Sequence, residues 1–259
     1  MRRFATASPS VLHLPVLRLP TVVFPGIPIS IAIVEADAGA ERPLRGVLTG
    51  AAADEISEQH GGQLALLGDG CHVGTIIDVL PSGPERGFWR HQRWGNSTTL
   101  VETTSYTSRK GMAVHAMCGD RVALLETAEK SACGVRMAKF GLLRDEEIAV
   151  DQQRLLEHEA SEAHALLPIL RQKYELQLCT LEEQAAMPCV ELLRMHPFIG
   201  RSAKPPVDAA SLSFWCAAWL PLPREARCHL LALQCPHKRM RDVVDAMRLL
   251  VASSHEEDA

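Results

Sequence analysis

The stretch Leu14-Pro15-Val16-Leu17-Arg18-Leu19-Pro20-Thr21-Val22-Val23-Phe24-Pro25-Gly26 decides how the chain begins to fold. Apolar residues partly alternate with others over Val11–Leu17 and alternate cleanly over Ile29–Ile33. Alternation of period two places apolar side chains on one face of a strand, so we expect two half-buried strands. Between them, Phe24-Pro25-Gly26 predicts a turn, because Pro fixes φ, Gly permits positive φ and Phe can insert into a core. Direct contact of these three residues with a ligand is the less favoured alternative.

Short apolar runs continue to about residue 148, and turn signals such as Pro81–Pro84, Arg109–Gly111 and Cys118–Asp120 separate several of them. The Ala-rich region Glu35–Glu58 lacks alternation, and we expect one helix there, around either Pro43–Thr49 or Ala51–Gln59. Many short strands predict a sandwich or a small barrel. The further strand candidates are Gln63–Leu67, Val73–Leu80, Thr98–Thr103, Met112–Met117, Arg121–Leu125 and Gly134–Lys139.

The second half changes to helical spacing. Pro168 should kink or split the first helix, and Thr180 with Glu183 resembles a capping box that opens another. Asp208 is a candidate N-cap for the next helix, and Pro223 fits the first turn of the one after it. Apolar stripes typical of one helix face are Leu156, Ala160, Ala163, Leu167, Leu170 and Tyr174, then Leu212, Trp215, Cys216 and Trp219, then Met240, Val243, Val244, Met247, Leu250 and Val251.

This separation of element types predicts an α+β fold. We expect a β-barrel of short strands over residues 11–148, followed by a C-terminal helical bundle over residues 149–252. Residues 1–10 are expected to form a flexible N-terminal tail and residues 253–259 a disordered acidic tail. Trp215 and Trp219, one helical turn apart, are expected in the core of the helical part.

Composition limits the classes of function. The chain of 259 residues is 47% hydrophobic and 22% charged, which permits a packed core, and its net charge of -4 argues against a general polyanion binder. Its eight cysteines form no C-x-x-C pair, so we expect reduced, partly buried thiols. No run reaches the ~20 apolar residues that span a bilayer. We therefore expect a cytoplasmic protein; a nuclear location stays open, and the basic start Met1–Ser8 is too short to predict a mitochondrial signal.

The opening stretch resembles the start of the Lon protease N-terminal domain, a substrate-binding domain with a PUA-like β-barrel. Pro28–Ile31 fits the next strand of that family, Glu35 its strand-ending glutamate, and Val73-Gly74-Thr75-Ile76-Ile77 its VGT-bearing strand. The family's G-x-x-R-F turn differs here, since Gly119-Asp120-Arg121-Val122 is one residue shorter and lacks the aromatic residue. The resemblance covers residues 11–252 and implies the barrel and helices described above.

The helical half is most similar to cereblon, a eukaryotic member of that family. Ala217–Leu222, Leu230-Leu231 and Arg239-Met240-Arg241 follow its pattern in order. Because the sequence ends at Ala259, we expect neither cereblon's C-terminal zinc domain nor the ATPase and protease domains of Lon. The resemblance implies binding of a polypeptide substrate or partner protein, with ubiquitin-ligase components as one class of partner.

No motif for catalysis stands out. The sequence lacks a phosphate-binding G-x-x-x-x-G-K-[ST] loop, a G-x-S-x-G elbow and an H-E-x-x-H helix. His158-Glu159 with His164, and Cys235-Pro236-His237 with His229, could be drawn as metal ligands, but a solvated helix face and a turn are the favoured interpretations. Scattered catalytic residues stay open as a third reading. We therefore expect a non-enzymatic protein without metal or cofactor.

The most unusual local feature is the loop Glu85–Trp94. The chain has six Phe, four Trp and two Tyr, and this loop holds three of them among three arginines. Trp and Arg are preferred interface anchors, and such a mixture could hold an extended peptide or stack on RNA bases. A hairpin folded back on the barrel is the structural alternative. The candidate partner-binding residues are Arg86, Phe88, Trp89, Arg90, Arg93 and Trp94.

We thus predict a protein- or peptide-binding module of the Lon N-terminal type that recognises substrates or acts as an adaptor in protein degradation. An RNA-binding PUA-like protein that uses the Arg/Trp loop is the alternative, and the acidic net charge places it second.

Overall fold

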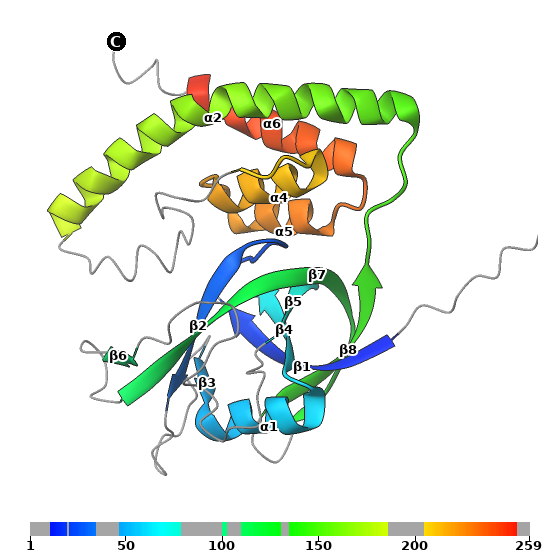
Figure 1. Ribbon diagram of the computed structural model, residues 1–259, viewed down its shortest axis with the longest axis vertical. Helices are drawn as coiled ribbons and strands as arrows, with labels where there is room; N and C mark the ends of the chain where they lie inside the picture. Colours follow the sequence, from blue (N-terminus) through cyan, green and yellow to red (C-terminus); the bar gives the residue numbers. More distant parts are fainter. Residues whose placement is uncertain are drawn as a thin grey trace, which may run out of the picture. The chain divides into compact units, whose positions relative to one another are not determined.

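The computed structural model describes residues 11–19, 21–34, 47–78, 100–102, 110–130, 135–185 and 205–252. Both predicted tails and the loop Glu85–Trp94 lie outside these ranges. The chain divides into two compact units: Met1–Val23 with Pro28–Leu143, and Phe24–Ile27 with Arg144–Ala259. The first unit holds the strands and one helix, and the second holds the remaining helices (Figure 1).

The first unit contains a closed barrel. Its strands are β1 (Val11–Leu19), β4 (Gln63–Gly68), β5 (Val73–Asp78), β7 (Lys110–Lys130) and β8 (Arg136–Leu143). They pair in the order β7-β5-β4-β1-β8, and pairing of β8 with β7 closes the ring (Figure 1). β1 and β4 run parallel, and the other pairs in the ring are antiparallel. The predicted α+β class and the barrel are confirmed.

The strand β7 corrects an expectation from the sequence. It runs without a break through Cys118-Gly119-Asp120, where we expected a turn between two short strands. Cys118 pairs with Ile77 and Arg121 with Thr75, so two residues of β7 face one residue of β5. The Gly-Asp pair therefore forms a β-bulge within one 21-residue strand, because a bulge accommodates an extra residue without ending the pairing.

Three shorter strands extend the sheet from the first part of β7. β2 (Pro28–Val34) pairs antiparallel with β7 and parallel with β3 (Val47–Thr49), and β6 (Leu100–Glu102) pairs with β7. The helix α1 (Gly50–His60) confirms the second of the two expected helix positions. The alternative helix is wrong at residues 47–49, which form β3.

The strand β4 is buried on both faces. Leu64 and Leu66 pack in one cluster with Ile56 of α1, whereas Ala65 and Leu67 pack in a second cluster with Phe140 and others. A strand covered on both sides reads as a continuous apolar run, which explains the sequence Leu64-Ala65-Leu66-Leu67.

Gly74 of β5 lies opposite Leu67 of β4, where the two backbones approach too closely for any side chain. A Cβ at this position would lie 2.0 Å from the backbone oxygen of Leu66. The glycine in the VGT stretch is thus required by this close approach.

The second unit consists of α2 (Val150–Ala185), α4 (Ala209–Trp219), α5 (Arg224–Ala232) and α6 (Pro236–Ala252), together with the segment Phe24–Ile27. The expected helix start at Thr180 is wrong, because α2 continues through this position. Of the two outcomes expected at Pro168, a split is wrong, because α2 continues through it; Figure 1 shows that α2 changes direction along its length.

Packing of the helices follows the apolar stripes of the sequence. α2 packs against α6 and α4, and α4 packs against α6 and α5. α4 is buried from Leu212 to Trp219, as expected for a helix that is apolar on all sides. The expected core position of Trp215 and Trp219 is confirmed. Buried stripe residues are Leu156, Ala160, Ala163, Leu167 and Leu170 of α2 and Met240, Val243, Val244 and Met247 of α6.

The cysteines only partly follow the expectation of reduced thiols. Cys118, Cys216 and Cys235 are free, and the first two are buried. Cys71 and Cys228 are disulfide-bonded, which the scattered spacing did not predict. Within the described ranges, no helix has the length and apolar character needed to cross a membrane.

Candidate functional site

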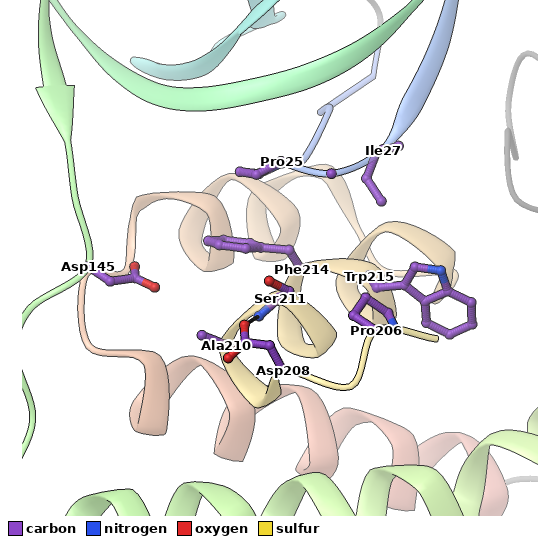
Figure 2. A pocket seen from close by; sticks show the side chains of 10 residues that line it. Pro25, Ile27, Asp145, Pro206, Asp208, Ala210, Ser211, Phe214 and Trp215 are labelled. Atoms are coloured by element: carbon purple, nitrogen blue, oxygen red, sulfur yellow. Dashed lines mark hydrogen bonds between the residues drawn. The ribbon is translucent and has the colours of Figure 1, made fainter. Parts of the chain in front are cut away.

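A hollow of about 300 Å³ opens in the second unit. Figure 2 shows its side chains, which come from the Phe24–Ile27 segment, the chain before α2 and the start of α4. Most of the lining is apolar, and among the residues that the structure describes its ionisable side chains are Asp145 and Asp208. The ten lining residues are Pro25, Gly26, Ile27, Asp145, Pro206, Asp208, Ala210, Ser211, Phe214 and Trp215.

The start of α4 forms one side of the hollow. Asp208 has extended backbone angles (φ -68°, ψ 125°), and its Oδ2 accepts the backbone N–H of Ser211 at 2.7 Å. The predicted N-cap is thus confirmed. Val207 precedes this cap and is 98% exposed.

A buried arginine on α6 holds Asp145, which also lines the hollow. The Arg239 side chain, on α6, is fully buried, and its Nη1 and Nη2 donate to both carboxylate oxygens of Asp145 at 2.8 and 2.6 Å. Nε donates to Ser213 Oγ at 2.7 Å, and Nη1 also donates to the Leu233 carbonyl at 2.8 Å. This bidentate pair fixes Asp145, which is 29% exposed, at the edge of the hollow.

Two phenylalanine rings stack between two guanidinium groups next to the hollow. Arg239 lies 3.7 Å from the ring centroid of Phe214, which lies 6.2 Å from that of Phe24. Arg227 lies 5.8 Å from the Phe24 ring, and burial lowers the pKa of its guanidinium from the ordinary value. Cation–π and aromatic contacts of this kind stabilise a fixed arrangement. These contacts of Phe24 thereby hold the Phe24–Ile27 segment within the helical unit.

The structure thus places Phe24-Pro25-Gly26 at the hollow. Phe24 is 0% exposed, and Pro25 with Gly26 forms a turn in which Gly26 has a φ of 73°. That positive φ is the conformation that glycine adopts most easily. The three residues therefore combine an internal anchor with two positions in the wall of the hollow.

The predicted Arg/Trp loop, with Arg86, Phe88, Trp89, Arg90, Arg93 and Trp94, lies outside the described residues. Among the described residues, no group of three or more His, Cys, Asp or Glu could hold a metal ion. Both histidines of the second suggested set lie near carboxylates: His237 Nε2 lies 3.4 Å from Glu159 Oε1, and His229 Nε2 lies 3.5 Å from Asp242 Oδ2.

Both aspartates of the hollow hold structural hydrogen bonds. Asp145 accepts two from Arg239 and Asp208 accepts one from Ser211, and among the described residues the lining has no His, Cys or Lys. Elsewhere, burial raises the pKa of the Cys118 and Cys216 thiols to about 12, far from the range of a reactive thiolate. The hollow can accept an apolar group, with a carboxylate nearby for a cation.

Sequence reasoning missed Asp145 and Arg239, which lie 94 residues apart. One signal was present: Arg239 falls on the same helix face as Met240, Val243 and Met247. An arginine within an apolar stripe indicates a buried charge with a partner, because an unpaired buried charge is too costly. The sequence does not indicate which residue is that partner.

A closed β-barrel followed by packed helices is the arrangement of a Lon N-terminal domain. Comparison with solved structures gives this fold for the N-terminal domain of Mycobacterium avium complex Lon protease, at 17% identity and a TM-score of 0.50, over 92% of this chain and 98% of that one. A Lon N-terminal domain protein from Xanthomonas campestris is 14% identical with a TM-score of 0.47, over 90% and 98% of the two chains. No family model and no curated protein matches. The first comparison confirms the expected Lon N-terminal fold.

Proposed function

We propose that this chain is a non-enzymatic module that binds polypeptides. The observation that carries the proposal is the fold, which is that of the N-terminal domain of a Lon protease. The resemblance of Leu14–Gly26 to the substrate-binding domain of that family supports the same role. The apolar hollow, whose described lining residues include no His, Cys or Lys beside the two aspartates, is consistent with binding without chemistry. Its role would be to hold an extended segment of another chain.

The finer role that we propose is substrate recognition or adaptor work in protein degradation. The order of Ala217–Leu222, Leu230-Leu231 and Arg239–Arg241 supports a cereblon-like branch with a ubiquitin ligase as partner. Binding of this chain to a purified cullin-ligase adaptor, measured by calorimetry, distinguishes that branch. Absence of binding would leave polypeptide recognition in place and remove the ligase role.

The Arg/Trp loop is the proposed contact surface in the first unit. Trp89 and Trp94 supply large aromatic surfaces, and Arg86, Arg90 and Arg93 supply forked donors for backbone carbonyls and carboxylates. We expect Trp89→Ala/Trp94→Ala to weaken polypeptide binding by at least about tenfold, the size of one interface anchor.

The test uses a fluorescein-labelled polypeptide that is held unfolded by reduction and carboxymethylation of its cysteines, with fluorescence anisotropy as the readout. The folded parent of that polypeptide is the specificity control. Val150→Ala/Leu249→Ala is the matched variant, since these apolar side chains are exposed at 73% and 72%. If the unfolded and folded probes bind equally, or neither binds, the proposed function is wrong.

RNA binding is the second candidate, favoured by the alternation of arginines and aromatic rings in residues 85–94. It predicts binding to single-stranded RNA that weakens steeply with salt. The acidic net charge and the two carboxylates of the hollow oppose a polyanion. A gel shift at low salt decides between the two candidates.

A further inference from the structure

We propose that the hollow of the helical unit binds a basic side chain, arginine or lysine, of an extended polypeptide. This inference rests on the proposed function and names the class of segment that the module selects. It begins from the size of the hollow, about 300 Å³. Binding pockets start at about that volume, so the hollow accommodates one or two side chains.

The walls fit the stem of a long side chain. Phe214 and Trp215 are buried at 7% and 6% exposure, and Pro25, Ile27 and Pro206 complete an apolar lining. Arg239 already covers Phe214 on one side at 3.7 Å, so the ring contributes to the wall of the hollow from a fixed position. The methylene groups of arginine and lysine pack on such surfaces while their charged ends reach water or a carboxylate.

The charge of the hollow selects a cation. Arg239 balances Asp145 through two short hydrogen bonds, whereas no cation within the described ranges pairs with Asp208. The N-terminus of α4 offsets about half a unit charge near Asp208. The full negative charge of Asp208 exceeds the half positive charge of the helix N-terminus, so this margin of the hollow stays negative. It therefore attracts a cation and repels a phosphate.

Asp208 offers the acceptor for that cation. Its Oδ2 is used by the Ser211 N–H, and Oδ1 holds no hydrogen bond to the part of the chain that the structure describes. Asp208 is exposed at the margin of the hollow, next to Pro206 and Val207. A guanidinium or ammonium group at Oδ1 would form a charge-assisted hydrogen bond while its stem lies on the apolar wall.

Asp208→Asn removes the negative charge of Asp208 without removing its helix cap. Asparagine caps a helix as well as aspartate does, so the bond to Ser211 and the start of α4 should persist. Ala210→Lys is the second variant. It places a resident cation on a half-buried position of the lining, and lysine is a good helix former. Asp151→Asn is the matched control, because it removes an exposed aspartate from the first turn of α2 in the same unit.

The experiment uses the full chain and three fluorescein-labelled peptides: arginine alternating with valine, and the same peptide with every arginine replaced by glutamine or by glutamate. We expect the arginine peptide to bind about tenfold more tightly than the glutamine peptide at low salt, which corresponds to ~1.4 kcal/mol. The glutamate peptide should bind most weakly, and added salt should reduce the preference.

Asp208→Asn and Ala210→Lys should each bring the arginine-to-glutamine ratio close to one, whereas Asp151→Asn should preserve it. Thermal melts by circular dichroism verify that each variant is folded. A wild-type chain without preference, or a preference unchanged in both folded variants, overturns the inference. Binding of the unfolded, carboxymethylated polypeptide is measured beside it. If that binding persists, only the assignment of the hollow fails, and if it is absent the proposed function fails.

Discussion

The buried pair of Arg239 and Asp145 gives the sharpest test of how the helical unit is held together. Arg239→Met keeps most of the side-chain volume and removes four hydrogen bonds, two of them to the Asp145 carboxylate. Breaking one partner of a buried ion pair costs about 3–5 kcal/mol. Asp145 is 29% exposed and can regain water, so we place the loss at about 3 kcal/mol, the lower end of that range.

The pairing itself is tested by a double-mutant cycle. Asp145→Asn should cost less than Arg239→Met, since the amide still accepts one bond from the guanidinium. The double variant should then be more stable than the sum of the two losses predicts, by about 1–2 kcal/mol. Arg239→Lys should restore little of the stability that Arg239→Met loses, because an ammonium group cannot donate two parallel hydrogen bonds to both carboxylate oxygens.

The assay is urea unfolding followed by circular dichroism, whose signal comes mainly from the helices. Because the chain has two units, the helical transition is fitted separately if two appear. Arg241→Met is the control: this neighbour is 57% exposed, and its contact with Glu159 at 3.5 Å should contribute at most about 1 kcal/mol. A loss below about 1 kcal/mol for Arg239→Met, or strictly additive losses in the cycle, would show that the Arg239–Asp145 pair does not hold the helical unit together.

Three further predictions follow from single contacts. Gly74→Ala should prevent folding of the barrel or destabilise it by more than about 3 kcal/mol, seen in expression and melting, because a Cβ would collide with backbone. Iodoacetamide at neutral pH should label half-buried Cys235 and spare Cys216, whose pKa burial raises to about 12, as mass spectrometry would show. The Glu162 carboxyl should titrate below its usual pKa, because Arg248 donates to it, and Arg248→Gln should restore the usual value in an NMR titration. The Glu162–Arg248 ion pair therefore stabilises the folded state at pH values above the usual glutamate pKa. This stabilisation is lost as the pH falls through the lowered pKa of Glu162.

Each of these predictions has a control. Gly141→Ala should be nearly neutral, because a Cβ there meets nothing closer than Leu125 at 3.8 Å, and equal damage from both glycine variants would contradict the steric argument. Denaturant should expose Cys216 to the reagent, so native labelling at the same rate would rule out burial. Arg241→Gln should leave the Glu162 titration unchanged, and a matching shift would point to general surface charge instead.

Much of the architecture could be predicted because it is written in local patterns. Period-two runs located the strands β1 and β2, short apolar runs located β4 and β5, and period-three-to-four stripes located α2 and α6, since each pattern depends only on near neighbours. The Asp208 cap was likewise readable, because its acceptor and the N–H of Ser211 are three residues apart. The resemblance of Leu14–Gly26 to the Lon family pointed to the fold that the comparison then confirmed.

Tertiary structure alone decided the features that join distant residues. Cys118–Asp120 reads as a turn locally, yet pairing with β5 makes it a bulge, because the ladder on either side outweighs a local turn preference. The Phe24–Ile27 segment lies between two strands in sequence but belongs to the helical unit, where Phe24 stacks between Phe214 and Arg227. The partner of Arg239 lies 94 residues away. A sequence pattern reports which side chains must be buried, whereas which of them meet depends on the path of the whole chain.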